Sequence, residues 1–371
     1  MTWQLLWLGF LLRLAIATWN GFWGPSFGAE ADAANYHQMA VAHSLGVTEL
    51  TPNRIQLHLI YSYFLGSFYY FTANSLFLGS VLSCGVWVMS AALLNRVMGL
   101  LSFPVSQRRK AMLIYAVLPT SILWTGVTIR EPYQLLFINL SMYAAVKVSV
   151  GLSPWNWLLL FVAVAAGSVL HAGLFIFGVT LIVACIATYV ARQRRQIRVV
   201  ASLIVMPILI LALVTGYRFL TNAYSYGLGG GLTSAVEDFQ RRGLMTDSRA
   251  VYRHNVTIED PFDLVTFVPA AVLQYWFEPL LWRMSRPFDV AFALENLLRA
   301  FLIWMAVAGL WRASSHRRWL VLPIFLSYLA IETAWALGTF NWGTAARHHV
   351  PSVGLLLVAG LAHVWPERRA E

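Results

Sequence analysis

The chain has 371 residues, of which 59% are hydrophobic and only 11% are charged, and its mean hydropathy is +0.64. This composition excludes a soluble globular domain, and apolar runs recur that are long enough to cross a bilayer core of ~30 Å as helices. The net charge of +10 lies largely in short basic segments between these runs, where it orients a membrane protein, so we expect no nucleic-acid partner.

The first apolar run, about 3–23, lacks a preceding basic segment and contains Arg13, so we interpret it as a retained span and not as a cleaved signal. The segment 24–73 follows as a first outer loop. Within it, 55–70 is rich in Tyr, Phe and Ser and favours a helix lying in the membrane interface. Further spans are expected at about 74–95, 111–128, 133–150, 155–171, 172–190, 199–217, 287–311, 319–340 and 351–365.

A large polar outer loop, 217–263, precedes the segment 264–282. Pro269 and the pair Glu278-Pro279 interrupt this segment, which favours a re-entrant or interfacial structure over a continuous span. The chain is therefore predicted to be an all-α polytopic membrane protein with about ten transmembrane helices, and 1–371 is expected to form a single transmembrane domain.

Clusters of Arg and Lys at 107–110, 192–198, 312–318 and 368–369 predict the cytoplasmic loops and place both termini in the cytoplasm. Carboxylates, by contrast, gather on the opposite face. A polar site at the outer ends of the helices is the hypothesis that this asymmetry favours.

The first candidate segment comes directly after the first span and contains Glu30, Asp32, Tyr36 and His37. On a helix, Asp32 and Tyr36 are four residues apart and share a face. The simpler interpretation is that Asp32 only caps a surface helix, because Asp is favoured at that position.

The second candidate is Arg130-Glu131-Pro132 at the outer end of the third expected span. Pro at the first position of a helix and a carboxylate beside it are also ordinary signals of a helix start. Two carboxylates brought together, Asp32 and Glu131, can hold a divalent cation or act as a base and its orienting partner. We therefore favour a functional role for Glu131.

Near the last span lie Arg347, His348 and His349. The planar guanidinium of Arg347 suits a phosphate, whereas a snorkelling Arg at a span end is the simpler alternative. The adjacent histidines point to different faces of a helix, so a metal pair made from both is not expected. In the large outer loop, Arg253 stands among basic and aromatic residues that suit a sugar phosphate.

Ionisable residues inside the spans need partners, because burying an isolated charge in hydrocarbon is costly. Glu295 and Arg299 are four residues apart and are expected to pair with each other. Arg13 and Glu332 are expected to pair between the first and ninth spans. We interpret all four as structural residues that fix the arrangement of the helices.

The order of several motifs resembles the GT-C superfamily of integral-membrane glycosyltransferases, in particular bacterial relatives of the protein mannosyltransferase and aminoarabinose transferase group. The motifs are Leu12-Arg13-Leu14, then Asp32 with Tyr36-His37, Pro119 to Trp124, Arg130-Glu131-Pro132, and Gly343-Thr344 with Arg347-His348. The similarity covers the N-terminal third and the C-terminal segment, and the middle only by hydropathy. This sequence departs from several members in having no Asp-Glu pair at the first site, and a large C-terminal soluble domain is not expected.

This resemblance implies a transferase that moves a sugar from a polyprenyl-phosphate-linked donor to a glycan, lipid or protein acceptor in cell-surface glycan or glycolipid assembly. Asp32 would be the catalytic base or a ligand of Mg or Mn, Glu131 the second acidic residue, and Arg347 a grip on the lipid phosphate. Glu30, Tyr36, His37, Arg130, Arg253 and His348 are the other candidates for substrate binding. The implied location is the bacterial inner membrane, with the site on the periplasmic side.

Other interpretations of the sequence remain open. A lipid-linked oligosaccharide polymerase or ligase could share the donor and the sidedness without needing a first-loop Asp, so Asp32→Asn separates the two. A lipid-linked sugar flippase or transporter would place ionisable groups near the midplane on interrupted helices, usually in repeated halves. A non-catalytic partner in envelope assembly would tolerate loss of the carboxylates.

Overall fold

The computed structural model of the chain describes residues 2–24, 29–47, 59–151, 153–191, 250–252, 262–313 and 315–362. Within these ranges nearly every residue is helical, and only an isolated antiparallel bridge joins Val251 to Asn341. The elements are α1 (Thr2–Phe22), α2 (Glu30–Ser44), α3 (Ile60–Phe71), α4 (Leu76–Leu100), α5 (Val105–Val117), α6 (Pro119–Thr125), α7 (Glu131–Val150), α8 (Pro154–Leu170), α9 (Ala172–Ala191), α12 (Asp263–Phe277), η3 (Leu281–Arg283), α13 (Pro287–Arg312), α14 (Ser315–Gly338) and α15 (Trp342–Leu361).

Six of the described helices, α1, α4, α7, α9, α13 and α14, are long and apolar enough to cross a membrane. The all-helical membrane class is therefore supported by the structure. The expected span 199–217 lies outside the described residues, and α8 is a shorter apolar helix of 17 residues. The total of about ten spans stays a prediction.

One expected span, 111–128, is interrupted in the structure. α5 ends at Val117 and α6 begins at Pro119, with Leu118 in an extended conformation (ψ 118°) between them. The physical reason is Pro119, which disfavours the helical region for the residue before it but is well accommodated at a helix start. The prediction of one continuous helix there was wrong.

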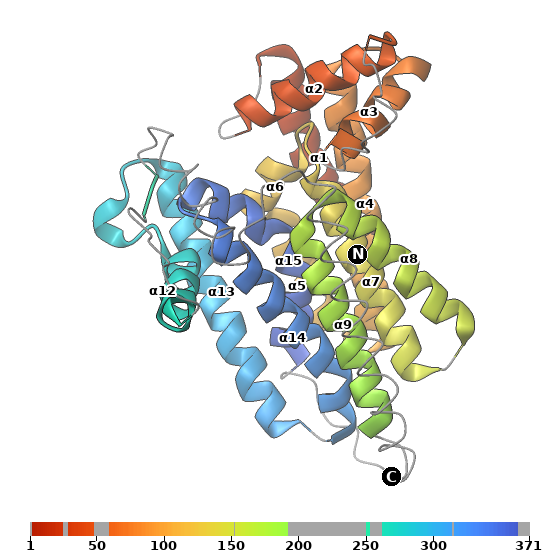
Figure 1. Cartoon of the computed structure of the whole chain (residues 1–371), viewed down its shortest axis with the longest axis vertical. Coiled ribbons are helices and arrows are strands. Elements are labelled where there is room, and N and C mark those ends of the chain that lie inside the picture. Colours follow the sequence, from red (N-terminus) through yellow and green to blue (C-terminus); the bar gives the residue numbers. More distant parts are fainter. Residues whose placement is uncertain are drawn as a thin grey trace.

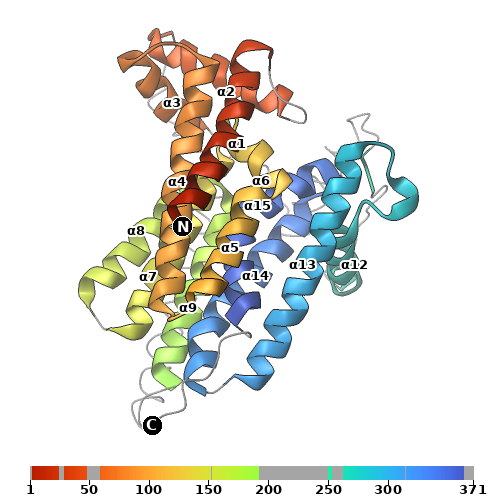
Figure 2. The ribbon, with the colours of Figure 1, turned by 180° about the vertical axis from the view of Figure 1, so that it is seen from behind.

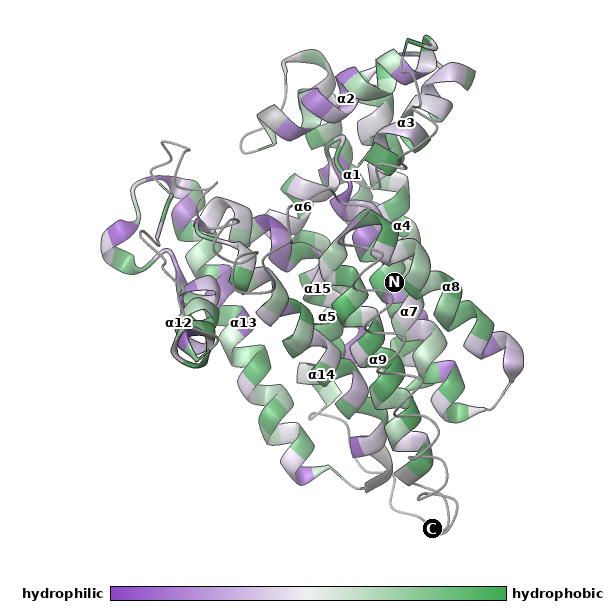
Figure 3. Cartoon of the chain, in the orientation of Figure 1, coloured by the Kyte–Doolittle hydropathy of each residue, from purple (hydrophilic) through white to green (hydrophobic). Residues whose placement is uncertain are grey.

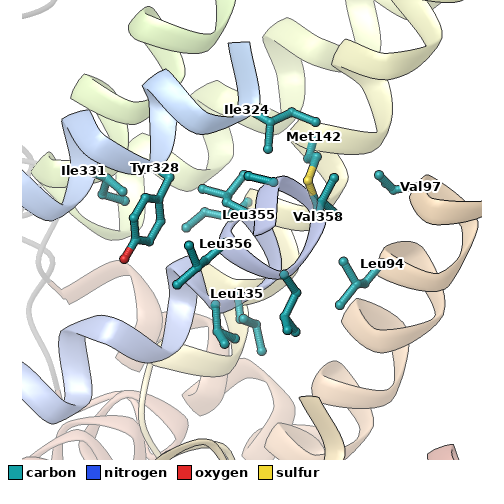
Figure 4. Close-up of a cluster of buried hydrophobic side chains, with 14 of the residues drawn as sticks. Leu94, Val97, Leu135, Met142, Ile324, Tyr328, Ile331, Leu355, Leu356 and Val358 are labelled. Carbon is teal, nitrogen blue, oxygen red and sulfur yellow. The ribbon is translucent and has the colours of Figure 1, made fainter. Parts of the chain in front are cut away.

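The centre of the bundle is α15, whose residues from His349 to Leu361 are all buried. A helix without an exposed polar face must be surrounded by other helices, and α15 packs on α7, α13 and α14. Figure 4 shows this core, where Leu355, Leu356 and Val358 of α15 face side chains of α4, α7 and α14. The expected last span, 351–365, thus begins earlier, and Arg347 to His349 belong to its first turns.

α2 and α3 pack on each other and cap one end of the bundle, beyond α1 and α4 (Figures 1 and 2). His37 Nδ1 and the Tyr69 hydroxyl lie 2.9 Å apart and join the two helices. A helix is confirmed within the segment 55–70, whereas its position in a membrane interface stays a prediction. Apolar residues dominate the bundle helices, and hydrophilic ones are more frequent towards this end and around α12 (Figure 3).

Arg13 is fully buried in α1, but it does not pair with Glu332 as predicted. Its guanidinium donates to the Ala116 carbonyl (2.9 Å), Thr125 Oγ1 (2.6 Å) and Ser121 Oγ (2.8 Å), and it lies 3.6 Å from the centre of the Trp87 ring. The break between α5 and α6 frees carbonyl and hydroxyl groups at the height of Arg13. These acceptors satisfy the arginine without a carboxylate.

Glu332 pairs with His349 instead (Oε2 to Nδ1, 2.7 Å) and accepts from Ser352 Oγ (2.5 Å). The predicted pair of Glu295 and Arg299 is likewise not formed as an ion pair in the described part of the chain. Glu295 accepts from the backbone N–H and the hydroxyl of Thr120 (2.8 and 2.5 Å), and Arg299 donates to Asn296 Oδ1. Glu295 thus bonds to another helix, whereas Arg299 bonds within its own helix.

Candidate functional site

Three charged residues from distant parts of the chain meet at the end of the bundle that α2 covers. Arg347 of α15 donates through one terminal nitrogen to Asp32 Oδ2 of α2 and through Nε to Glu131 Oε1 of α7. We call Asp32, Glu131 and Arg347 the Arg347 clamp. The structure therefore brings together the two acidic residues and the arginine that the sequence singled out.

The two carboxylates of the clamp differ sharply in exposure. The Asp32 side chain is 44% exposed, whereas that of Glu131 is 1% exposed and that of Arg347 is 13% exposed. Glu131 Oε2 is buried and has no hydrogen-bond partner among the residues that the structure describes. Asp32 can thus be reached from outside the protein, and Glu131 lies behind Arg347.

Local sequence signals position each member of the clamp. Pro132 in the first turn of α7 fixes the helix start at Glu131. Asn341 caps α15 by accepting from the Thr344 N–H (2.7 Å), which sets Arg347 in the second turn of that helix. Asp32 lies near the start of α2, so the position of its carboxylate relative to Arg347 depends on how α2 packs on the bundle.

That docking is apolar. Ala29, the residue before α2, and Ala33 of α2 are buried in a cluster with Trp124 of α6 and Val350 of α15. Small residues at these positions let α2 lie close to the other two helices. Asp32 stands between the two alanines in sequence and faces the start of α15, next to Arg347.

The guanidinium of Arg130 makes fewer hydrogen bonds within the described residues than that of Arg347. It donates to the Leu170 carbonyl at a long 3.4 Å, and its buried Nε has no partner among the described residues. Arg347, in contrast, already serves two carboxylates. The spare donors of Arg130 make it the better candidate for an anionic group of a ligand.

Tyr36 lies between the clamp and a group of packed tyrosine rings. Its ring packs edge-on against Tyr61 (5.0 Å between centroids), and Tyr61 packs against Tyr133 (5.3 Å). Burial raises the pKa of the Tyr36 hydroxyl, and the charges of Arg130, Glu131, Arg347 and Asp32 act on it too. Tyr36 therefore remains a neutral hydroxyl beside the clamp.

His37 turns away from the clamp towards Tyr69 of α3, and burial lowers the pKa of its imidazole. Glu30 begins α2, but its side chain lies outside the described residues, as does Arg253. The structure thus leaves the expected roles of Glu30 and Arg253 open. It places His37 in the contact between α2 and α3.

His348, the residue after Arg347, lies among aromatic rings that the sequence did not single out. It stacks on Trp335 (5.5 Å between centroids) and meets His171 edge-on (5.7 Å), while its Nδ1 lies 3.2 Å from Thr339 Oγ1. His171 was visible at a turn between two expected spans, on the same face as Asp32. Trp335 gave no such signal, because one Trp in an apolar run is not distinctive.

The hydrogen bonds of His171 define the tautomer of its neutral imidazole. Its Nδ1 accepts from the Gly173 N–H (3.0 Å) and faces Trp335 Nε1 (3.5 Å). Two donors at Nδ1 mean that the neutral ring carries its proton on Nε2. The ring therefore offers a donor on its other edge.

Arg347 engages one oxygen of each carboxylate of the clamp, Asp32 Oδ2 and Glu131 Oε1. A divalent cation held by Asp32 and Glu131 would have to share these carboxylates with Arg347, and the expected metal site stays a prediction. Across the described residues, no group of three or more His, Cys, Asp or Glu side chains is arranged to hold a metal ion.

Comparison with protein-family models, with curated proteins and with solved structures finds no match.

Proposed function

We propose that the protein is a membrane glycosyltransferase that moves a sugar from a polyprenyl-phosphate-linked donor to an acceptor at the outer face of the membrane. The observation that carries this proposal is the Arg347 clamp, in which a half-exposed carboxylate and a buried one share an arginine at one end of an apolar bundle. The resemblance of the motifs to GT-C enzymes supports the choice of donor.

In the proposed reaction, the Asp32 carboxylate accepts the proton of the acceptor hydroxyl while the acceptor oxygen forms a bond to the anomeric carbon. The bond between that carbon and the phosphate oxygen breaks, and polyprenyl phosphate leaves with the electron pair. Asp32 suits this role because its carboxylate is accessible to an acceptor that arrives from water.

The leaving phosphate needs positive charge. Arg130 has donors to spare, and Arg347 lies between Asp32 and Glu131. Glu131 is buried and holds Arg347 in place, which makes it a positioning residue in this scheme. Trp335, His171 and His348 present rings beside the clamp that suit the face of a sugar.

The proposed location is the bacterial inner membrane, with the clamp on the periplasmic side, because the basic segments favour the opposite ends of the helices as cytoplasmic. Glycan, lipid and protein acceptors all fit an open Asp32. We favour a role in cell-surface glycan or glycolipid assembly.

The experiment is to incubate the purified full-length protein with a panel of polyprenyl-phosphate sugars, each with Mg, with Mn and with a chelator, and to measure release of polyprenyl phosphate. We expect one donor to be consumed, and we expect chelation to leave the rate unchanged because Arg130 and Arg347 supply the charge. Turnover that depends strictly on metal would contradict the proposed role of the arginines. Failure to consume any donor would contradict the proposed activity.

A further inference from the structure

A second group of ionisable side chains lies in the interior of the bundle, where α12, α14 and α15 meet. Glu332 of α14 is fully buried, and His349 and Ser352 of α15 are each 1% exposed. His349 Nδ1 lies 2.7 Å from Glu332 Oε2, and Ser352 Oγ donates to Glu332 Oε1 (2.5 Å). On the other edge of the ring, His349 Nε2 lies 3.1 Å from the carbonyl oxygen of Tyr275 in α12. The proposed reaction uses none of these four residues.

Both ring nitrogens of His349 thus face oxygen atoms, and this arrangement determines where protons must lie. A backbone carbonyl oxygen only accepts hydrogen bonds, so Nε2 carries a proton and donates it to Tyr275. Nδ1 and a carboxylate oxygen at 2.7 Å attract each other only with a proton between them. That proton belongs either to an imidazolium beside an ionised Glu332 or to a carboxylic acid beside a neutral imidazole. In both cases the pair is neutral overall and holds one proton in its contact.

The charged groups around the pair favour the same number of protons. Glu295, Arg299 and Tyr328 line one small cavity together with His349. Both oxygens of Glu295 accept hydrogen bonds from α6, as those of an ionised carboxylate do, so Glu295 and Arg299 bear opposite charges. Tyr328 is a neutral phenol. An ionised Glu332 beside a neutral His349 would therefore add an uncompensated charge to the apolar interior, which is costly.

We propose that Glu332 and His349 share one buried proton and that this pair positions Arg347 in the clamp. His349 lies two residues after Arg347 in α15, so both belong to the same turn of the helix. The bonds of His349 to α12 and α14 fix the rotation of this turn, and with it the direction in which the Arg347 side chain leaves the helix. Glu332, His349 and Ser352 are positioning residues, and the inference does not depend on the proposed transferase activity.

The first test detects the shared proton directly. The full-length protein, labelled with ¹⁵N-histidine, is reconstituted in lipid bilayers, and magic-angle-spinning NMR reports which ring nitrogens carry protons. The signals of His349 are those that move in Glu332→Gln. We expect Nε2 to be protonated, and Nδ1 either to be protonated as well or to accept from a carboxylic acid whose infrared C=O band disappears in Glu332→Gln. A bare Nε2, or a bare Nδ1 without that infrared band, overturns the proposal.

The second test follows the effect of the pair on the clamp. Glu332→Gln can keep every hydrogen bond without the shared proton, because its amide nitrogen donates to Nδ1 and its amide oxygen accepts from Ser352. Glu332→Leu, of similar size, keeps none. In protein labelled with ¹⁵N-arginine, the Nε signal of Arg347, identified by its loss in Arg347→Gln, reports on the contact with Glu131. We expect this signal to keep its wild-type shift in Glu332→Gln and to be displaced in Glu332→Leu. No displacement in Glu332→Leu, or an equal one in Glu332→Gln, contradicts the positioning role.

The matched control is Asn95→Leu, which also replaces a polar side chain by Leu but breaks a bond to Arg108 near the other end of α4. It should leave the Arg347 signal unchanged even where the unfolding midpoint falls. If Glu332→Leu does not fold, Ser352→Ala still decides, because it removes one of the two bonds to Glu332 and should displace the Arg347 signal by a smaller amount. An unchanged signal in Ser352→Ala then overturns the positioning role.

Discussion

At the scale of single residues, the Arg347 clamp combines two carboxylates with opposite environments. Glu131 is buried, so removing its cation leaves an uncompensated buried charge, whereas Asp32 is half-exposed and its ion pair is screened by solvent. We therefore expect the pair of Arg347 with Glu131 to contribute to the stability of the fold, and the pair of Arg347 with Asp32 to contribute to the proposed reaction.

Arg347→Gln should lower the free energy of unfolding by roughly 3–5 kcal/mol, the usual cost of breaking a buried pair. Asp32→Asn should change it by no more than about 1 kcal/mol. Thermal or denaturant unfolding in detergent measures both. The double variant Glu131→Gln/Arg347→Gln should be more stable than Arg347→Gln alone, because it removes the stranded charge. A double variant less stable than both single variants would contradict this account.

The sequence could identify Asp32, Glu131 and Arg347 because charge is rare in this chain and the basic loops predict which helix ends lie together. It could not identify the partners of Arg13 and Glu332. Those depend on how far each helix slides along its neighbour, and on the break at Pro119, which supplies acceptors to Arg13. Trp335 became a site residue only through the packing of α14 on α15.

At the scale of elements, the contact between α1 and α4 rests on glycines that permit close approach. A Cβ on Gly21 of α1 would lie 2.5 Å from Phe77 Cβ and 2.8 Å from the Phe77 Cα, so neighbouring backbone would have to move. A Cβ added to Gly85 of α4 would have no heavy atom of another residue within 4 Å. The two glycines make a matched pair, because both lie in candidate spans.

Gly21→Ala should destabilise the protein by about 1–3 kcal/mol, since overpacking forces the two helices apart, whereas Gly85→Ala should leave stability unchanged or slightly raised. Unfolding midpoints of the two variants in the same detergent provide the comparison. A larger loss for Gly85→Ala than for Gly21→Ala would contradict the described packing of α1 on α4.

The sequence predicted the helices well where apolar runs were long and bounded by charge, as for α4, α7 and α13. It failed at α5 and α6, where a proline broke an otherwise apolar run, and at α15, where Arg347 to His349 looked like a loop but belong to the helix. Polar residues inside a helix start are poorly recognised from hydropathy, because hydropathy does not register buried partners such as Glu332.

At the scale of the whole molecule, the α2 end of the bundle must face away from the cytoplasm if the proposed site lies on the periplasmic side. Cys84 and Cys185 are both buried, so the wild type should react little with a membrane-impermeant maleimide. Asn74→Cys, between α3 and α4, should be labelled from the periplasmic side, and Gln107→Cys, in the basic start of α5, only after the membrane is opened. Reversed labelling would place the clamp in the cytoplasm and contradict the proposed sidedness.

The most direct test of the central claim is the rate of sugar transfer by Asp32→Asn compared with Asp263→Asn, with each rate divided by the amount of folded protein. Asp263 provides the matched control, because it is an exposed carboxylate in the first turn of α12. Loss of a general base lowers kcat by typically 10²- to 10⁴-fold, so we predict that Asp32→Asn loses at least a hundredfold in kcat and Asp263→Asn keeps the wild-type rate. Full activity in Asp32→Asn would contradict the assignment of the Arg347 clamp as the active site.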